Sequence, residues 1–326
     1  MNSLRTLFQA AVAALGLLVA APAALSQAFP SKPVRIIVPF PAGGLTDVVA
    51  RALGQDLTRA WGQTVIVENK PGANQQIAAD FVAKAPGDSH MYMFGDKTSL
   101  AILPALYSKL PYDPVKDFTP VVGIMQTANA LVVAPSLNIN TWAEFVAAAK
   151  ARPGKINYGS FGIGSVTHLD SETMAGLAGI SLNHIPYKGI AEVLPAVASG
   201  QIETALSGIS PLIPLLKQNR LKALAISATA RSPVLPDVPT FTELGIPYVG
   251  VSWFGLIGPS GIPRAVVDKV ATDVARVVGT PEFREKYITG VGLEPFNLGP
   301  DQLAQQLNND RARYAGSVKA ANIKLD

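Results

Sequence analysis

The fold is decided by residues 34–61, which read VRIIVPFPAGGLTDVVARALGQDLTRAW. Val34 to Pro39 form a run rich in β-branched side chains that is typical of a buried strand, and Pro41 to Gly44 interrupt it. From Val48 to Trp61, apolar residues recur at helical spacing. The stretch therefore predicts a strand, a glycine-rich loop and a helix.

This unit of strand, loop and helix recurs along the chain. Further strands are predicted at 64–68, 91–94, 130–134, 156–159, 182–185, 202–206, 223–227 and 249–257. Further helices are predicted at 75–84, 141–151, 166–176, 190–198, 209–217, 264–278, 281–287 and 300–320. The alternation predicts an α/β fold in which mainly parallel sheets are covered by helices.

The order of these elements predicts two lobes. The late strand and the helices that follow it return most economically to the first sheet, so lobe 1 is expected to comprise 29–128 plus 251–326, and lobe 2 to comprise 129–250. Connecting segments near 126–129 and 248–251 would then form a hinge. A ligand cleft between the lobes would meet the carboxyl ends of strands, where open α/β sheets bind their ligands.

The composition excludes several classes of function. Of 326 residues, 48% are hydrophobic and 15% charged, and none is cysteine, which excludes disulfides, thiolate metal sites and a cysteine nucleophile. His90, His168 and His184 form no short ligand pair, so we expect neither a metal nor another cofactor. The net charge of +4 comes without a cluster of Lys and Arg, which argues against a nucleic-acid partner.

Residues 1–28 have the pattern of a secretory signal peptide. One positive charge at Arg5 precedes an apolar run at 10–21, and small residues follow near a cleavage site expected at 26–28. The apolar run is shorter than the roughly 20 residues that span a bilayer, although an uncleaved anchor stays an alternative. Export to the periplasm leaves two main classes of function, a hydrolase and a solute receptor.

The loop from Phe40 to Asp47 is the sharpest local motif. Its glycines allow a tight turn, and the helix start behind it offers unpaired N–H groups and partial positive charge to a carboxylate or phosphate. From spacing alone, an ordinary turn with Thr46 or Asp47 as N-cap fits equally well.

A second loop, from Gly159 to His168, repeats this arrangement in the other half, and two facing anion sites suit a diacid. Ser165 and Thr167 are also good N-caps, and His168 fits a helix residue as well as a ligand contact. Lys188 adds a cation near a third strand end, unless it is simply solvated.

The sequence gives little support to a hydrolase. No serine has glycine at both the second position before and the second position after it, so the nucleophile elbow is missing. Asp47, Asp80 or Asp170 could pair with a histidine, but nothing in their spacing favours a catalytic triad.

Four ordered motifs give the chain a resemblance to a known family. They are KPVRIIVPFPAGGLTD at 32–47, VENKPGA at 67–73, LPYDPVKDF at 110–118 and HIPYKG at 184–189. Together with the signal peptide, they resemble the Bug/TctC family, the solute receptors of tripartite tricarboxylate transporters. The resemblance implies a two-lobed, type II-like periplasmic binding protein without catalytic activity. It also implies a monomer that closes on a small organic acid and presents it to membrane transporter subunits; a ligand sensor for a signalling partner is the alternative use.

In the family, backbone N–H groups and waters of the two loops hold the carboxylate, which favours the anion-binding interpretation here. The expected ligand-binding residues are Phe40, Ala42, Gly43, Gly44, Leu45, Asp47, Asn74, Gln75, Thr98, Ser160, Phe161, Gly162, Gly164, Ser165, Thr167, His168, Lys188 and Ser207.

Two departures from the family pattern bear on specificity. Leu45 stands where many relatives have a small residue, and Gln75 with Gln76 where they have a small pair. We expect a partly apolar or aromatic ligand, with Phe40, Phe161 and Trp253 as walls, and side-chain hydrogen bonds from Asn74 and Gln75.

Overall fold

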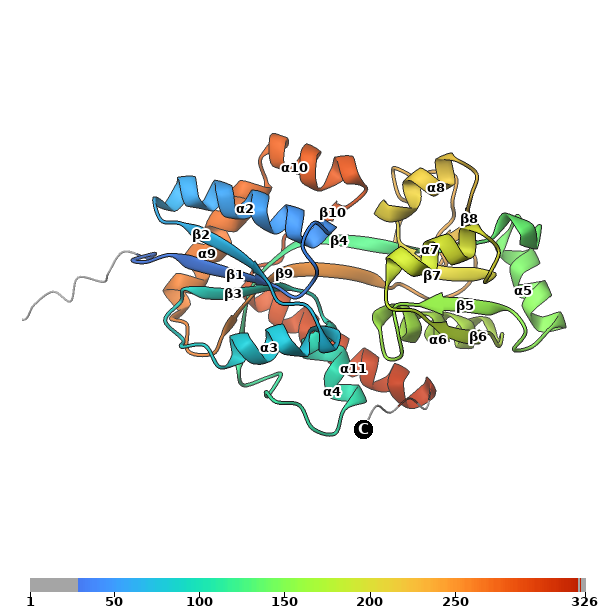
Figure 1. Ribbon diagram of the computed structural model, residues 1–326, viewed down its shortest axis with the longest axis horizontal. Coiled ribbons are helices and arrows are strands. Elements are labelled where there is room, and N and C mark those ends of the chain that lie inside the picture. Colours follow the sequence, from blue (N-terminus) through green and yellow to red (C-terminus); the bar gives the residue numbers. More distant parts are fainter. Residues whose placement is uncertain (1–28, 322, 324–326) are drawn as a thin grey trace, which may run out of the picture.

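The computed structural model describes residues 29–321 and 323, and the predicted signal peptide lies outside them. Figure 1 shows two lobes joined by a long strand, β4 (Phe118–Val133), and by the chain that enters β9 (Val251–Pro259). Strand β4 pairs with β9 up to Ala128 and with β7 from Asn129 onward. We propose a boundary at this change of partner, with lobe 1 comprising 29–128 and 251–321 and lobe 2 comprising 129–250.

Each lobe contains the same alternation of elements. Lobe 1 contains β1 (Val34–Val38), α2 (Leu45–Trp61), β2 (Val65–Asn69), α3 (Gln76–Ala83), β3 (Met91–Gly95), α4 (Leu103–Leu106), α9 (Arg264–Val278), α10 (Pro281–Tyr287), β10 (Glu294–Pro295) and α11 (Pro300–Ala321). Lobe 2 contains α5 (Trp142–Ala151), β5 (Asn157–Ser160), α6 (Val166–Ala178), β6 (Asn183–Pro186), α7 (Ile190–Ala198), β7 (Thr204–Gly208), α8 (Ile213–Lys217) and β8 (Lys222–Ile226).

The strands form one sheet in the order β2-β1-β3-β9-β4-β7-β5-β6, with β8 and β10 also pairing with β4. In lobe 1, β9 runs away from lobe 2, and β3 is antiparallel to β9 and parallel to β1. In lobe 2, β7 is antiparallel to β4 and parallel to β5. The carboxyl ends of β1 and β3 therefore point toward lobe 2, and those of β5 and β7 point toward lobe 1.

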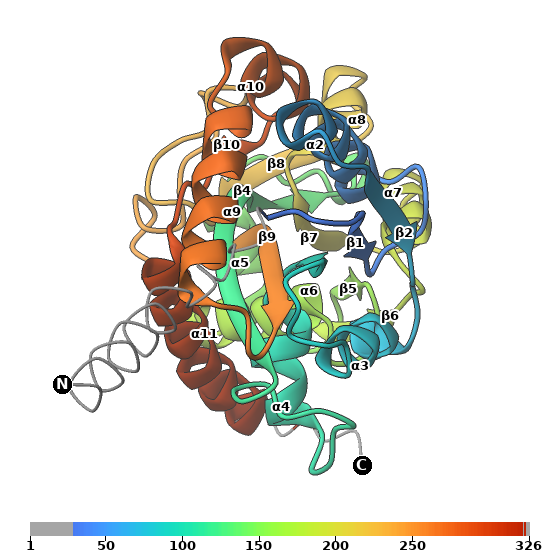
Figure 2. The ribbon, with the colours of Figure 1, turned by 90° about the vertical axis from the view of Figure 1, so that its left-hand side faces the viewer.

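Helices cover both faces of the sheet in each lobe. In lobe 1, α2 and α9 pack on one face through side chains such as Leu53 and Val274, and α3 and α11 pack on the other through Val82 and Leu303. Figure 2 shows the strands of this lobe between α2 and α10 on one side and α3 and α11 on the other. In lobe 2, α7 and α8 cover one face, and α5 and α6 cover the other.

The structure corrects two predictions of detail. The first detail is strand direction: the sheet is mixed, because β4 and β9 run in opposite directions and make antiparallel pairs with their neighbours. The second detail concerns residues 126–129, which were predicted to connect the lobes ahead of a strand beginning at 130. The chain does cross here, but inside the unbroken strand β4. The polar residues Gln126, Thr127 and Asn129 lower the β-propensity of this segment, but pairing on both sides overrides it.

Candidate functional site

The first loop leaves the start of α2 uncapped. Gly43 has a φ of 81°, in the left-handed region that glycine adopts without strain, and Gly44 is the N-cap, with no side chain bonded to the helix amides. Among the described residues, the N–H groups of Leu45 and Thr46 have no acceptor. Residues 41–45 are exposed and Thr46 is 6% exposed, so the amide of Leu45 and the partial positive charge of the helix start lie at an exposed loop.

Asp47 holds the first loop in shape. Its Oδ2 atom accepts the N–H of Gly43 at 2.8 Å, and its Oδ1 atom accepts Asn69 Nδ2 at 2.9 Å and pairs with Arg51 at 3.0 Å. Burial raises the pKa of Asp47, but the bonds from Arg51, Gly43 and Asn69 outweigh that effect and lower its pKa overall. Both carboxylate oxygens have partners inside the protein, so Asp47 positions the loop.

The second loop shares the bond from a glycine amide to a helix side chain, but its helix has a side-chain cap. Gly164 has a φ of 75°, and its N–H donates to Nδ1 of His168 at 3.0 Å. Ser165 is the N-cap of α6, and its hydroxyl accepts the N–H of His168 at 3.3 Å. His168 and Asp47 thus hold the same position in their helices, the third residue, and each accepts the amide of a glycine four residues earlier.

Most polar groups of the second loop are used inside the protein. The N–H of Phe161 donates to Thr167 Oγ1 at 3.0 Å, and that of Gly162 donates to Ser160 Oγ at 3.2 Å. Gly162 and Gly164, both among the expected ligand-binding residues, therefore have their own amides occupied. Within the described chain, the N–H groups of Val166 and Thr167 at the start of α6 have no acceptor.

A stack of three rings supports the second loop. The rings of His168 and His184 lie parallel with centroids 3.8 Å apart, and Tyr158 stacks on His184 at 5.0 Å. Burial lowers the pKa of His168 to about 4. Burial, and then repulsion from His168, lower the pKa of His184 to about 4. Both rings are neutral at pH 7, which keeps Nδ1 of His168 available as the acceptor for Gly164.

Ser160 and His184 do not form a nucleophile and base. Their Oγ and Nε2 atoms are 2.6 Å apart, but the hydroxyl of Ser160 donates to the carbonyl of Gly162 at 3.0 Å. The Oγ atom also accepts the N–H of Gly162 at 3.2 Å, so the imidazole shares this hydroxyl with both backbone groups of Gly162. Ser160 is also fully buried, so no substrate reaches it.

The remaining predicted residues lie at the same strand ends but differ in whether their side chains are exposed. Gln75 is 6% exposed and donates through Nε2 to Asp96 at 3.0 Å, so it holds the turn after β3, while its Oε1 atom has no partner among the described residues. Thr98 and Ser207 are buried after β3 and on β7. The exposed residues are Ala42, Asn74 and Lys188. Among the described residues, the ammonium of Lys188 has no acidic partner, so this cation is available.

The predicted apolar walls are partly corrected. Phe40 packs edge-on against Phe254, and Phe161 packs on the core of lobe 2; both are half-buried. Trp253 is fully buried and donates through Nε1 to Asp310 at 2.7 Å, so its role as a wall is wrong. Leu45 and Ile163 are exposed on the two loops, at 36% and 53%.

Sequence reasoning missed Asn69 and Arg51, which bind Asp47 and each other. Asn69 closes β2, and the pairing of β1 with β2 brings it beside the first loop, opposite Val38. Only this pairing, which is not visible along the chain, shows that the two residues support the loop.

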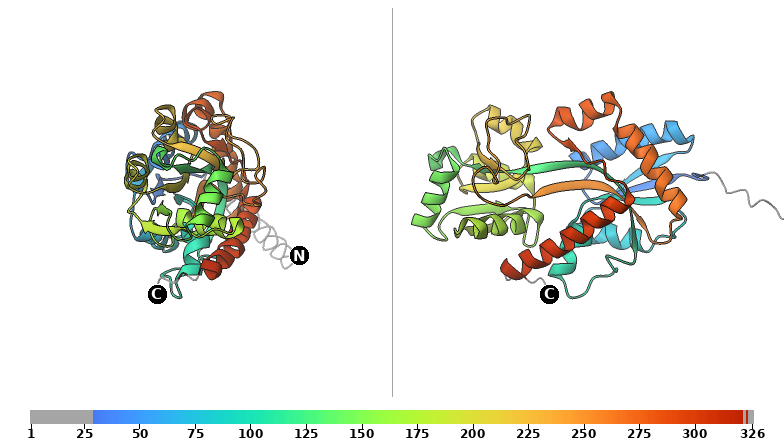
Figure 3. Two further views of the ribbon diagram at one scale, coloured as in Figure 1. Left: turned by 90° about the vertical axis from the view of Figure 1, so that its right-hand side faces the viewer. Right: turned by 180° about the vertical axis from the view of Figure 1, so that it is seen from behind.

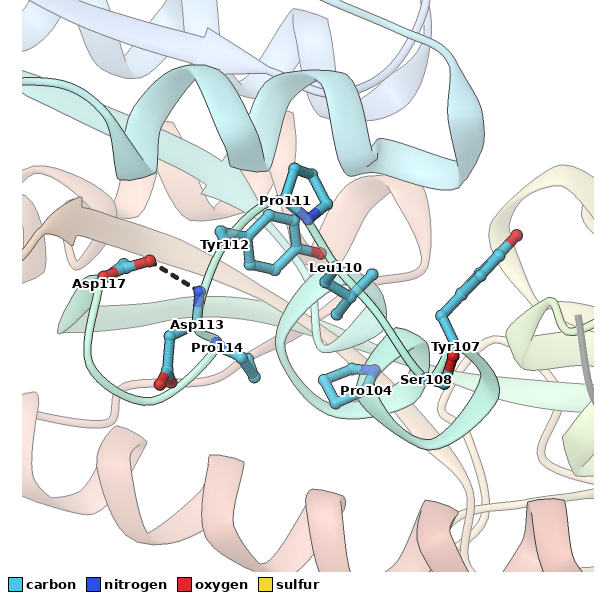
Figure 4. Close-up of a pocket in the computed structure, with 9 residues that line it drawn as sticks. All are labelled: Pro104, Tyr107, Ser108, Leu110, Pro111, Tyr112, Asp113, Pro114 and Asp117. Atoms are coloured by element: carbon cyan, nitrogen blue, oxygen red, sulfur yellow. Dashed lines mark hydrogen bonds between the residues drawn. The ribbon is translucent and has the colours of Figure 1, made fainter. Parts of the chain in front are cut away.

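A separate pocket of about 550 Å³ is lined by the end of α4 and by the segment that connects α4 to β4. Figure 4 shows its lining, which includes Tyr107, Tyr112 and Asp113, with the N–H of Asp113 bonded to Asp117. The pocket contains much of the motif at 110–118, but none of the predicted ligand-binding residues lines it.

Comparison with known proteins identifies the family. A family model described as the tripartite tricarboxylate transporter family receptor, TctC, matches residues 49–323. The chain belongs to the TctC receptor family. This TctC receptor is 34% identical over 314 residues to a UPF0065 protein of Bordetella pertussis, covering 96% of this chain and 97% of that protein.

Two solved structures resemble this TctC receptor over nearly its whole described length. Rpa4515 of R. palustris, solved with adipate, is 32% identical with a TM-score of 0.82, over 91% of this chain and 99% of that one. MatC from Rhodopseudomonas palustris, solved with bound malate, is 31% identical with a TM-score of 0.77, over 89% and 100%. These matches confirm the predicted family and the two-lobed α/β binding-protein fold. In the part of this TctC receptor that the structure describes, no helix is both long and apolar enough to cross a bilayer.

Proposed function

We propose that this receptor captures a small organic dicarboxylate between the starts of α2 and α6. One observation carries the proposal: β1 and β5 end facing each other, and each leads into a helix whose first amides have no acceptor within the described chain. Charge-assisted hydrogen bonds from such amides contribute about 1.5 to 3 kcal/mol each. Four of them therefore account for much of a micromolar affinity, which corresponds to about 8 kcal/mol.

The relatives support a dicarboxylate of four to six carbons. Two similar structures, those of Rpa4515 and MatC, were solved with adipate and with bound malate. The exposed Leu45 and Ile163 and the half-buried Phe40 and Phe161 add apolar surface beside the free amides. This surface favours a ligand with an apolar chain, such as adipate, over a short hydroxy-diacid.

The proposed place of action is the periplasm. The sequence pattern of residues 1–28 supports export with cleavage near 26–28, and the TctC family supports delivery of the ligand to membrane transporter subunits. We propose that the mature protein works as a monomer that binds its ligand without chemical change. The buried Ser160, with its hydroxyl held in the loop, supports binding rather than hydrolysis.

Calorimetric titration of the purified mature protein with adipate, malate and benzoate tests the proposal. We expect micromolar binding of adipate, weaker binding of malate and the weakest binding of benzoate, which has a single carboxylate. Absence of heat with all three, together with no thermal shift across a wider set of mono- and dicarboxylates, would overturn it. Mass spectrometry of the ligand that copurifies with the protein gives an independent identification.

A further inference from the structure

A second set of contacts joins the lobes beside the strand crossings. Helix α6 of lobe 2 packs on lobe 1 through Leu169, which is fully buried in an apolar cluster with Leu103 of α4 and Tyr314 of α11. One turn further along α6, the hydroxyls of Thr173 and Ser317 are 3.1 Å apart. Figure 3, right, shows α11, in red, running diagonally below β4 and β9 toward lobe 2.

Asp170 is the polar centre of this contact. Its carboxylate is buried and accepts the hydroxyl of Tyr314 at 3.1 Å, and it pairs with Arg313 of α11 at 3.5 Å. Its other oxygen accepts Asn129 Nδ2 at 3.3 Å, at the residue where β4 enters lobe 2. One carboxylate thus links α6 to α11 and to the first crossing.

The second crossing is held by the same cluster. The carbonyl of Val249 accepts Arg313 Nη1 at 2.8 Å, and that of Val251 accepts the buried ammonium of Lys97 at 2.6 Å. Burial lowers the pKa of Lys97, while Asp170 and Asp310 act against that shift. Separating α6 from α11 would leave these charges without their partners, which is among the costliest changes in a protein interior.

We infer that the contact between α6 and α11 is the axis on which the lobes turn, and that Asp170 is the positioning residue that holds it. A chain crossing must lie close to the rotation axis, because it is covalently bound to both lobes. Both crossings are bonded to the Asp170 cluster, so α6 keeps its place against α11 while the two loops separate. Because Asp170 follows His168 by two residues, it also sets where the second loop stands relative to lobe 1.

An engineered disulfide tests the axis, with adipate and malate as probes. The chain has no cysteine, so Thr173→Cys combined with Ser317→Cys gives a single possible bridge across the contact. We expect the oxidised form to bind within twofold of the reduced form and to show the same ligand-induced change in small-angle scattering. A tenfold loss of affinity on oxidation, recovered on reduction, would place the contact on the surface that opens and overturn the inference.

A ligand-independent measurement keeps this inference separate from the proposed function on which the binding assay rests. Spin labels at Leu177→Cys and Ala315→Cys span the α6 and α11 contact, and labels at Ile77→Cys and Ala191→Cys span the facing strand ends. Without ligand, we expect a narrow distance distribution for the first pair and a broader one for the second. Equal breadth of the two distance distributions would overturn the assignment of the axis, even if adipate binds. If the wild type binds neither adipate nor malate, that result counts only against the proposed ligand class.

The role of Asp170 is tested with the same labels. Asp170→Asn is expected to broaden the distribution across α6 and α11. Asp310→Asn is the matched control, because Asp310 is also buried beside this cluster but its hydrogen bonds go to Trp253 and Gln306 within lobe 1. Unchanged distances in Asp170→Asn, or the same broadening in both variants, would overturn the assignment.

Discussion

Asp47 accepts the backbone N–H of Gly43, four residues before it, at 2.8 Å. His168 does the same for Gly164 at 3.0 Å, in a loop of unrelated sequence on the other lobe. In both loops this bond occupies the glycine amide. The first two amides of the helix that follows have no acceptor among the described residues. The loop is thus shaped by a side chain, and the binding groups belong to the backbone.

Gly43→Val is expected to weaken adipate binding at least tenfold and to lower the free energy of unfolding by about 1 to 2 kcal/mol. A Cβ at Gly43 meets no atom within 4 Å, so the effect comes from the φ of 81°, which a β-branched residue adopts only with strain. Gly62→Val is the matched control: it also has a positive φ and open space, but lies at the other end of α2. Titration calorimetry and urea unfolding measure both quantities, and equal binding by the two variants would contradict the model of the first loop.

Asp47→Asn is expected to weaken binding about tenfold and to destabilise the protein by about 1 to 3 kcal/mol. The amide presents one acceptor where Gly43, Asn69 and Arg51 require two, so buried donors lose their partners. Asp56→Asn on the same helix serves as control, because among the described residues Asp56 pairs with the exposed Arg59 alone. If Asp47→Asn binds as the wild type does, the carboxylate does not shape the site.

Stability is expected to fall as the pH decreases from about 6.5 to 4. His168 and His184 have pKa values of about 4 in the folded protein and about 6.5 in the unfolded chain. The unfolded state therefore binds more protons in this window, and each ring removes up to about 1.4 kcal/mol of stability per pH unit. The variant His168→Asn with His184→Gln keeps acceptors near the same positions and is expected to show a shallower slope in urea midpoints. Parallel slopes would show that these rings do not set the pH dependence.

Leu45→Ala is expected to reduce affinity for adipate about fivefold and to change malate binding less than twofold. The side chain is exposed beside the free amides, and burying part of it against a methylene chain contributes about 1 kcal/mol. Val48→Ala, on the next turn of α2 and also exposed, controls for the loss of apolar surface on the helix itself. Competition calorimetry with both acids measures the ratio, and an equal loss for the two acids would remove Leu45 from the determinants of specificity.

Local signals in the sequence predicted the elements that they delimit. Helices α9 and α10 begin and end as predicted, because Pro263 and the Thr280-Pro281 pair mark their starts and their apolar residues keep helical spacing. Strand β4 was predicted only over its last residues. Pro120 and Gly123 interrupt its sequence pattern. Beside each of them the register with β9 shifts, but the pairing continues, and this is visible only in the sheet.

The site was predicted to the level of loops and helix starts, but not to the level of individual amides. Whether an N–H is free depends on a side chain four residues later and, in the first loop, on Asn69 of the neighbouring strand. Asp170 shows the same limit. Its sequence neighbourhood suggests at most a catalytic carboxylate, and only the packing of α6 on α11 places it between Arg313 and Tyr314.

Because β4 is a central strand of both lobes, neither lobe of this receptor can be expressed as a separate domain. A truncated lobe would expose a long unpaired edge, which invites aggregation. Fluorescent reporters for a sensor built on this scaffold therefore belong in peripheral turns such as 228–238, where the chain between β8 and the Thr240 bridge leaves the sheet, and never between residues 118 and 133.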